Sequence, residues 1–328
     1  MSSDKLLEIK DLQVVFETYE GTIEAIDIDY LDIFKGETLG VVGETGCGKS
    51  VTTEALLNIV PKPGRIVDGE IIFEDENLLE KSEKEWRNIR GNKIAKIFQN
   101  PMSNLNPVYK IKTQMMDIIQ VHNDIDDEEM ENKCLELLEQ VKLSNPRTVL
   151  NSYPHELSGG MRQRVMIAMA LSCNPTLLIA DEPTTALDVT IQAQILKLIN
   201  ELKEEIGTTV LFITHDLGVI AQVAERTAVM YAGKIVELAD VEVIYENPYH
   251  PYTNGLIKSI PDKTESGERL PSVKGSVPDL KDIEPGCRFF PRCNRSSADC
   301  DQKDPELKEI EENHLVSCFH HLKEGENR

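Results

Sequence analysis

The sequence predicts an α/β fold built around a parallel sheet, and three apolar runs carry this prediction. Residues 37–42 become apolar toward their end, residues 177–180 are apolar throughout, and residues 209–213 form a third run. Runs of this kind are typical of buried parallel strands. Open α/β sheets bind their ligands at the carboxyl ends of such strands. We therefore expect the functional residues where these three runs end.

The first run leads directly into a loop pattern that binds phosphate. Residues 43–50 read GETGCGKS, which matches G-x-x-x-x-G-K-[ST] without a mismatch, and residues 50–60 can form a helix. The glycines let backbone N–H groups approach an anion next to the positive end of that helix. Lys49 adds a full charge for the β- and γ-phosphates, and Ser50 offers a hard oxygen ligand for Mg²⁺. The alternative is a glycine-rich turn that carries a lysine by chance, but that does not explain the flanking strand and helix.

Two carboxylates follow the second apolar run. Asp181 suits the coordination shell of Mg²⁺, and Glu182 is placed to act as general base on an attacking water. A solvated acidic turn after a strand is the alternative for either residue alone. An Asp-Glu-Pro sequence directly after four apolar residues is less common in such turns, so the pair favours a catalytic site.

Residues 157–164 read LSGGMRQR, and this segment is similar to the signature of ATP-binding cassette (ABC) proteins. Ser158, Gly159 and Gly160 offer a hydroxyl and exposed N–H groups just before a helix, which makes a second anion site. Alone, a Ser-Gly-Gly helix cap would be an ordinary structural feature. In the ABC family, two cassettes pack head to tail, and each ATP lies between the phosphate loop of one and the signature of the other.

The same resemblance assigns roles to residues elsewhere in the chain. Gln99 matches the glutamine that links the nucleotide site to a membrane partner, Asp188 the aspartate that communicates across the dimer, and His215 the histidine at the γ-phosphate. Phe16 is the predicted adenine-stacking aromatic, with Tyr19 and simple packing as alternatives. The resemblance implies Glu182, His215 and Gln99 as catalytic residues, and Ser50, Gln99 and Asp181 as magnesium ligands. The predicted ATP-binding residues are Phe16, Gly43, Glu44, Thr45, Gly46, Cys47, Gly48, Lys49, Ser50, Val51, Gln99, Ser158, Gly159, Gly160, Asp181 and Asp188.

Composition limits the classes of function. The chain has 328 residues and is 40% hydrophobic, which is enough for a substantial core. No stretch is long and apolar enough to span a bilayer, and the N-terminus lacks a signal-peptide pattern, so we expect a protein soluble by itself. A formal net charge of −22 disfavours a nucleic-acid partner, because phosphate backbones are bound by basic faces.

These patterns predict a P-loop NTPase (RecA-like) core with attached subdomains. Residues 1–250 form the expected ABC nucleotide-binding domain. Within it, short β-type runs at residues 1–35 and 65–74 predict an antiparallel subdomain, and residues 104–172 predict a helical subdomain that carries the signature. Residues 251–328 are expected to form a small metal-binding extension, which contains a polar linker at 262–282.

The extension narrows the resemblance further. Residues 247–261, NPYHPYTNGLIKSIP, resemble the segment that follows the core in oligopeptide/dipeptide importer ATPases. A cysteine block with the spacing C-x5-C-x6-C-x17-C comes next and consists of Cys287, Cys293, Cys300 and Cys318. Reduced thiols in a cytosolic protein favour a metal over disulfides, and four thiolates suit zinc or a [4Fe–4S] cluster. The resemblance implies the [4Fe–4S] cluster, with zinc or free thiols as alternatives. His314, His320 and His321 could substitute as ligands or be surface residues.

The sequence therefore predicts the ATP-hydrolysing subunit of an ABC importer for di- and oligopeptides. GGMRQRVMIAMAL resembles the D-type subunit of these importers, which implies a second ATPase of the F-type, two transmembrane permeases and an extracellular peptide-binding protein. The expected place is the cytoplasmic face of the membrane. A nickel or other small-solute importer is the alternative cargo class. A soluble, non-transport ABC ATPase is a further alternative, although such proteins usually carry two cassettes or a coiled-coil insertion.

Overall fold

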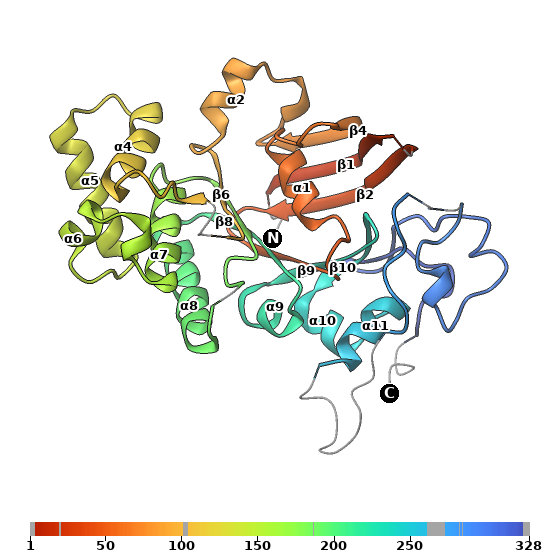
Figure 1. The fold of residues 1–328 in the computed structure, drawn as a ribbon. Coiled ribbons are helices and arrows are strands. Elements are labelled where there is room, and N and C mark those ends of the chain that lie inside the picture. Colours follow the sequence, from red (N-terminus) through yellow and green to blue (C-terminus); the bar gives the residue numbers. More distant parts are fainter. Residues whose placement is uncertain are drawn as a thin grey trace. The chain divides into compact units, whose positions relative to one another are not determined.

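The computed structural model describes residues 4–19, 21–100, 104–185, 187–260, 273–281, 283 and 285–323 (Figure 1). The chain forms two compact units. One consists of residues 1–80 and 212–328, and the other of residues 81–211. Much of the predicted linker at 262–282 lies outside the described residues. None of the helices in the described ranges combines the length and apolar character needed to cross a bilayer.

The first unit contains a four-stranded antiparallel sheet in the order β2-β1-β4-β5. Figure 1 shows its longer strands side by side in red and orange. Fully buried residues alternate along β1 at Leu7 and Ile9 and, beyond an irregularity, at Leu12 and Val14, so one face of the sheet packs on the core. The strands are β1 (Lys5–Thr18), β2 (Gly21–Phe34), β4 (Gly64–Phe73) and β5 (Glu76–Asn77). The predicted antiparallel subdomain is confirmed.

A second set of strands in this unit has the order β11-β12-β10-β9-β3. β3 and β9 are parallel, whereas β9, β10, β12 and β11 are antiparallel to one another in turn. All five residues of β3 are buried, which explains why an apolar run here forms a strand. The strands are β3 (Thr38–Val42), β9 (Arg226–Tyr231), β10 (Lys234–Asp240), β11 (Lys308–Glu311) and β12 (His314–Val316).

The helices of the first unit are short. They are α1 (Lys49–Leu56), α9 (Leu217–Val223), α10 (Val241–Glu246) and α11 (Pro251–Lys258), with 3₁₀ turns η1 (Leu78–Glu80) and η4 (Phe290–Arg292). Helix α1 ends earlier than the predicted 50–60, because Asn58 takes a left-handed conformation with φ 50°. Strand β12 pairs with β10, so the C-terminal extension continues the sheet of the core in the same compact unit.

The second unit is mostly helical, as predicted for residues 104–172. Two of its helices begin with side-chain caps. Ser82 and Glu85 form a capping box on α2, and the carboxylate of Asp126 accepts from two N–H groups of α5. The acidic run at 124–131 therefore begins a helix. The elements are α2 (Glu83–Ile89), β6 (Ile94–Ile97), α4 (Ile111–His122), α5 (Asp127–Gln140), α6 (Pro146–Asn151), η2 (Pro154–Glu156), α7 (Gly159–Ala170), β7 (Leu177–Asp181) and α8 (Val189–Ile206).

Strands β6 and β7 of the second unit are parallel, with Lys96 opposite Ile179. Every residue of β7 is buried, as is every residue of β8 (Thr209–Thr214), which contains the boundary between the two units. All three apolar runs that predicted the α/β class thus form fully buried strands.

Candidate functional site

The phosphate-loop pattern forms the connection between β3 and α1. Gly46 and Gly48 have φ values of 85° and 107°, a region that favours glycine. A Cβ atom on Gly43 would lie 2.1 Å from the carbonyl oxygen of Met230, so only glycine fits there. Thr45, Gly46 and Ser50 are exposed, which leaves the mouth of the loop open to a ligand. The loop therefore has the shape that an anion nest requires.

Lys49 is folded back over its own loop. Its ammonium donates to the carbonyl oxygens of Gly43 at 2.7 Å and Glu44 at 3.1 Å, and the residue is only 6% exposed. The buried thiol of Cys47 lies 3.8 Å from the same ammonium, and burial raises the pKa of this thiol. A triphosphate would replace the two carbonyl oxygens as the partner of the Lys49 charge.

Glu44 connects the phosphate loop to the C-terminal extension. Its backbone N–H donates to the hydroxyl of Tyr252 at 3.1 Å. Its carboxylate accepts two hydrogen bonds from Arg292, at 2.6 and 3.0 Å. Glu44 is among the predicted ATP-binding residues, whereas Arg292, which lies between Cys287 and Cys293, was not predicted.

The second unit brings two of the predicted catalytic residues together. The amide of Gln99 donates to Oε2 of Glu182 at 2.7 Å, and the hydroxyl of Thr185 donates to the same oxygen at 2.9 Å. Glu182 has φ 46°, which is rare for a residue other than glycine and is often found at functional sites. The Glu182 carboxylate is thus fixed from two sides directly after β7.

Asp181 ends β7 in a buried position. Its carboxylate lies 2.9 Å from the ammonium of Lys96 on the neighbouring strand β6, and both side chains are at most 6% exposed. The opposite charge offsets part of the cost of burying the Asp181 carboxylate. Lys96 was not predicted, because only the pairing of β6 with β7 brings its side chain to Asp181.

The predicted signature and dimer residues begin helices in this unit. The hydroxyl of Ser158 accepts from the N–H of Met161 and caps α7, and the carboxylate of Asp188 accepts from Ile191 and caps α8. A Cβ atom on Gly160 would lie 3.1 Å from Ile191, a close approach that favours glycine. The loop before α7 therefore has the N-terminal geometry expected of an anion site.

His215 belongs to the first unit and follows β8. It is exposed and lines a hollow whose other residues come from α9 and from the end of α11. Phe16 is half-buried, and its ring packs so closely on β4 that a Cβ atom on Gly64 would lie 2.6 Å from it. Tyr19 is fully exposed. The stacking role of Phe16 stays a prediction.

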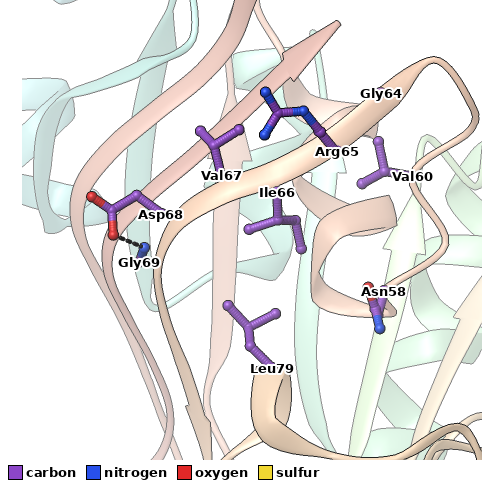
Figure 2. A pocket seen from close by; sticks show the side chains of 9 residues that line it. All are labelled: Asn58, Val60, Gly64, Arg65, Ile66, Val67, Asp68, Gly69 and Leu79. Carbon is purple, nitrogen blue, oxygen red and sulfur yellow. Dashed lines mark hydrogen bonds between the residues drawn. The ribbon is translucent and has the colours of Figure 1, made fainter.

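A larger hollow of about 560 Å³ lies on the antiparallel sheet (Figure 2). Its lining, labelled in the figure, comes from the end of α1, from β4 and from η1: Asn58, Val60, Gly64, Arg65, Ile66, Val67, Asp68, Gly69 and Leu79. The carboxylate of Asp68 accepts from the N–H of Gly69 at 2.8 Å, within β4 itself. The lining contains none of the predicted nucleotide residues, although Gly64 within it lies against the ring of Phe16.

The four cysteines of the extension line one enclosed cavity. Burial, with smaller contributions from the neighbouring thiols, raises the pKa of Cys287 to about 11 and that of Cys318 to about 12. His320 also lines this cavity, whereas His314 is buried against the carboxylate of Glu237 at 2.8 Å. The four cysteines and His320 thus share one cavity, and His314 is not part of its lining.

The spacing of the ligand atoms separates two kinds of metal site. Among the described residues, one group places three ligand atoms within 4.8 Å of one another, namely Asp299, Cys300 and His320. No three of the four cysteine sulfurs are therefore that close. Tetrahedral zinc, with bonds of about 2.3 Å, would need sulfurs about 3.8 Å apart. Any three of the four sulfurs therefore include a pair more than 4.8 Å apart, which is farther than in a tetrahedral zinc site.

Comparisons with known proteins agree with this geometry. Residues 27–185 match the family described as ABC transporter, and residues 236–300 match the oligopeptide/dipeptide transporter C-terminal region. A probable peptide ABC transporter ATP-binding protein of Sinorhizobium fredii is 49% identical over 97% of this chain and 95% of its own length. The oligopeptide transport ATP-binding protein OppD of Bacillus subtilis is 48% identical over 96% of this chain and 88% of its own length.

The chain belongs to the ATP-binding subunits of peptide ABC transporters. Its cassette resembles a solved structure titled as the dimeric, post-hydrolysis state of the ATP-binding cassette MJ0796 bound to ADP and Pi. That match has a TM-score of 0.63 and 30% identity, and it covers 72% of this chain and 98% of the other. The peptide-transporter ATP-binding subunit described here is thus an ATPase with the α/β fold of ABC cassettes.

Proposed function

We propose that this chain hydrolyses ATP to energise the import of di- or oligopeptides across the cytoplasmic membrane. The observation that carries the proposal is the similarity to peptide-transport ATP-binding proteins over nearly the whole chain, including the C-terminal region. The working assembly would contain a second cassette of the F-type, two transmembrane permeases and an extracellular peptide-binding protein. The chain would lie on the cytoplasmic face of the membrane as a peripheral subunit.

The phosphate loop is the proposed binding site of the triphosphate. Backbone N–H groups of residues 43–51 would bind the phosphate oxygens, and Lys49 would turn from its two carbonyl partners toward the β- and γ-phosphates. Ser50, Gln99 and Asp181 offer the hydroxyl, amide and carboxylate oxygens that Mg²⁺ prefers, so their chemistry fits this ion. Bound Mg²⁺ would supply charge neutralisation for the phosphates.

Hydrolysis requires a water held in line with the γ-phosphate. Glu182 is the proposed general base, since its carboxylate is held by Gln99 and Thr185 in a form that accepts hydrogen bonds. His215 would contact the γ-phosphate and help to orient it. Phe16 would stack on the adenine. The water oxygen would then bond to the γ-phosphorus while the bond from that phosphorus to the oxygen of the β-phosphate breaks. Glu182 would take the proton from the water, and ADP and phosphate would leave.

A second cassette would complete the nucleotide site. Ser158, Gly159 and Gly160 lie at the beginning of α7. Their N–H groups form the positive end of this twelve-residue helix. We propose that this signature binds the γ-phosphate held by the partner cassette, with Asp188 communicating between the two sites. The cap made by the Ser158 hydroxyl keeps the signature turn in one conformation.

The cysteine cavity is the proposed site of a [4Fe–4S] cluster. Four thiols from separate parts of the extension line it, and their spacing is wider than tetrahedral zinc requires. Bound iron and sulfide would cross-link the extension and stabilise its fold. Cys287, Cys293, Cys300 and Cys318 would hold it.

Transport is tested best in the cell that makes the protein. Deletion of this subunit should abolish uptake of labelled di- and tripeptides, and the wild-type chain should restore it, whereas Glu182→Gln should not. Loss of nickel uptake with normal peptide uptake would contradict the proposal. A purified chain that releases no phosphate from ATP in the presence of its partner cassette would contradict it as well.

The cluster is tested by anaerobic purification. The protein should absorb near about 400 nm and contain iron and sulfide, and replacing the four cysteines by serine should remove both. Cys173→Ser is the control, because Cys173 lies outside the extension. A colourless protein that contains zinc would refute the cluster.

A further inference from the structure

Arg292 links the cysteine-bearing extension to the phosphate loop. Its two terminal nitrogens donate to the two carboxylate oxygens of Glu44, at 2.6 and 3.0 Å. The Arg292 side chain is 5% exposed and that of Glu44 is 30% exposed, so solvent screens this pair only in part. Parallel, charge-assisted hydrogen bonds of this kind fix the geometry of both partners.

Several contacts besides the one with Glu44 orient the guanidinium of Arg292. Its Nε donates to the carbonyl oxygen of Lys274 at 2.8 Å, and its Nη2 lies 3.3 Å from two further carbonyl oxygens, those of Val273 and Gly275. It also lies over the ring of Tyr231, 5.6 Å from the centroid. Since these partners orient the side chain, Arg292 presents a fixed fork to the loop.

A second contact joins the same two segments. The hydroxyl of Tyr252 accepts from the N–H of Glu44, and its ring lies 4.6 Å from Tyr231 and 5.5 Å from Phe289 between ring centroids. Phe289 and Arg292 both lie in residues 287–293, whose first and last residues are cysteines. This seven-residue segment therefore carries two cavity thiols, the Arg292 that contacts Glu44 directly, and the Phe289 that packs on Tyr252.

The charge of Glu44 matters because it lies inside a loop that receives phosphates. An unpaired carboxylate there would repel the triphosphate and could draw Lys49 away from it. Arg292 neutralises this charge and fixes its direction. A change in the 287–293 segment would shift the guanidinium and so alter the loop.

We propose that Arg292 is a positioning residue for the phosphate loop, through which the cysteine-bearing extension sets the affinity of the site for ATP. The inference rests on the nucleotide site proposed above. Coupling between two sites is reciprocal, so ATP at the loop must also stabilise the 287–293 segment.

A mutant cycle tests the proposal with a fluorescent ATP analogue as the probe and equilibrium affinity as the readout. Arg292→Gln should weaken binding about tenfold, which corresponds to about 1.4 kcal/mol. Glu44→Gln is measured as the other single variant of the cycle, and adding it to Arg292→Gln should restore most of the affinity that Arg292→Gln loses. The matched control is Arg65→Gln, because Arg65 forms an exposed ion pair with Glu17 in the same unit.

Two results of this cycle would overturn the proposal. One is an affinity of Arg292→Gln within twofold of wild type. The other is a double variant as weak as Arg292→Gln alone, because that would show general damage to the extension. Lys49→Ala tests the nucleotide site separately. If Lys49→Ala binds the ATP analogue as tightly as wild type, the proposed nucleotide site is wrong. If Lys49→Ala loses affinity but Arg292→Gln does not, only the inference about Arg292 is wrong.

Hydrogen–deuterium exchange gives a readout that does not depend on activity. In the full chain carrying Glu182→Gln, ATP should slow exchange in the peptide containing residues 287–293. That response should disappear when Arg292→Gln is added. An exchange rate in this peptide that ATP leaves unchanged would refute the coupling.

Discussion

Replacement of Glu182 by glutamine isolates the proposed proton transfer. The new side chain has the same size, and its amide oxygen can still accept from Gln99 and Thr185, which now lie 2.7 and 2.9 Å from the carboxylate. The geometry at the end of β7 should therefore persist. An amide cannot take a proton from water, so the general base alone is lost.

The expected size of the effect follows from general-base catalysis. Such a base contributes about 10²–10⁴ in rate, and at about 1.36 kcal/mol per tenfold this equals roughly 3–5 kcal/mol of the barrier. Turnover is measured as phosphate release by the assembled cassettes. Affinity for a fluorescent ATP analogue is measured in parallel and should stay within threefold of wild type.

The control for this change is Glu242→Gln, an exposed glutamate at the beginning of α10. It should leave turnover and binding unchanged. Turnover of Glu182→Gln within tenfold of wild type would refute the assignment of the base. A large loss of nucleotide affinity would refute the idea that Gln99 and Thr185 preserve the local geometry.

Three further changes test the loop, the pH response and the core. Gly43→Ala should abolish nucleotide binding, since its Cβ atom would lie 2.1 Å from the Met230 carbonyl oxygen. Gly46→Ala meets no atom within 4 Å and adds only the strain of a side chain at φ 85°, so it should lose less affinity; similar affinities would contradict this. Burial raises the pKa of Glu37 to about 7 from 4.5, so the folded protein binds the proton more tightly. The free energy of unfolding in urea should therefore fall as the pH rises from about 4.5 to about 7, and Glu37→Gln should flatten this fall; an equal slope in both proteins would contradict it. Trp86→Ala should cost about 3–5 kcal/mol in the same assay, because Trp86 is fully buried, and a loss under about 1 kcal/mol would be inconsistent with that packing.

The elements that carry local sequence signals were predictable. The three apolar runs form buried strands, and the acidic run at 124–131 begins a helix, because burial and capping act over a few neighbouring residues. The end of α1 was less predictable. Its stop depends on a left-handed Asn58, a conformation that spacing alone does not indicate.

The candidate site divides in the same way. Motif spacing placed Lys49, Glu182 and the four cysteines in plausible roles, since each lies in a short pattern with its own chemistry. Lys96 and Arg292 could not be found in this manner. Arg292 lies 248 positions from Glu44, and only the folded chain brings the two together. Interactions of this kind need tertiary structure, whereas loops and caps need only their neighbours.

The pairing of β12 with β10 has a practical consequence for shortened versions of this protein. Removal of residues from 308 onward would leave the edge of β10 that pairs with β12 without a partner. At this edge, Glu237 pairs with Val316 and Leu238 pairs with Leu315. It would also take away the imidazole of His314 that lies against the buried Glu237. An uncovered strand edge recruits other chains, so a cassette trimmed to its ATP-binding portion should aggregate on expression.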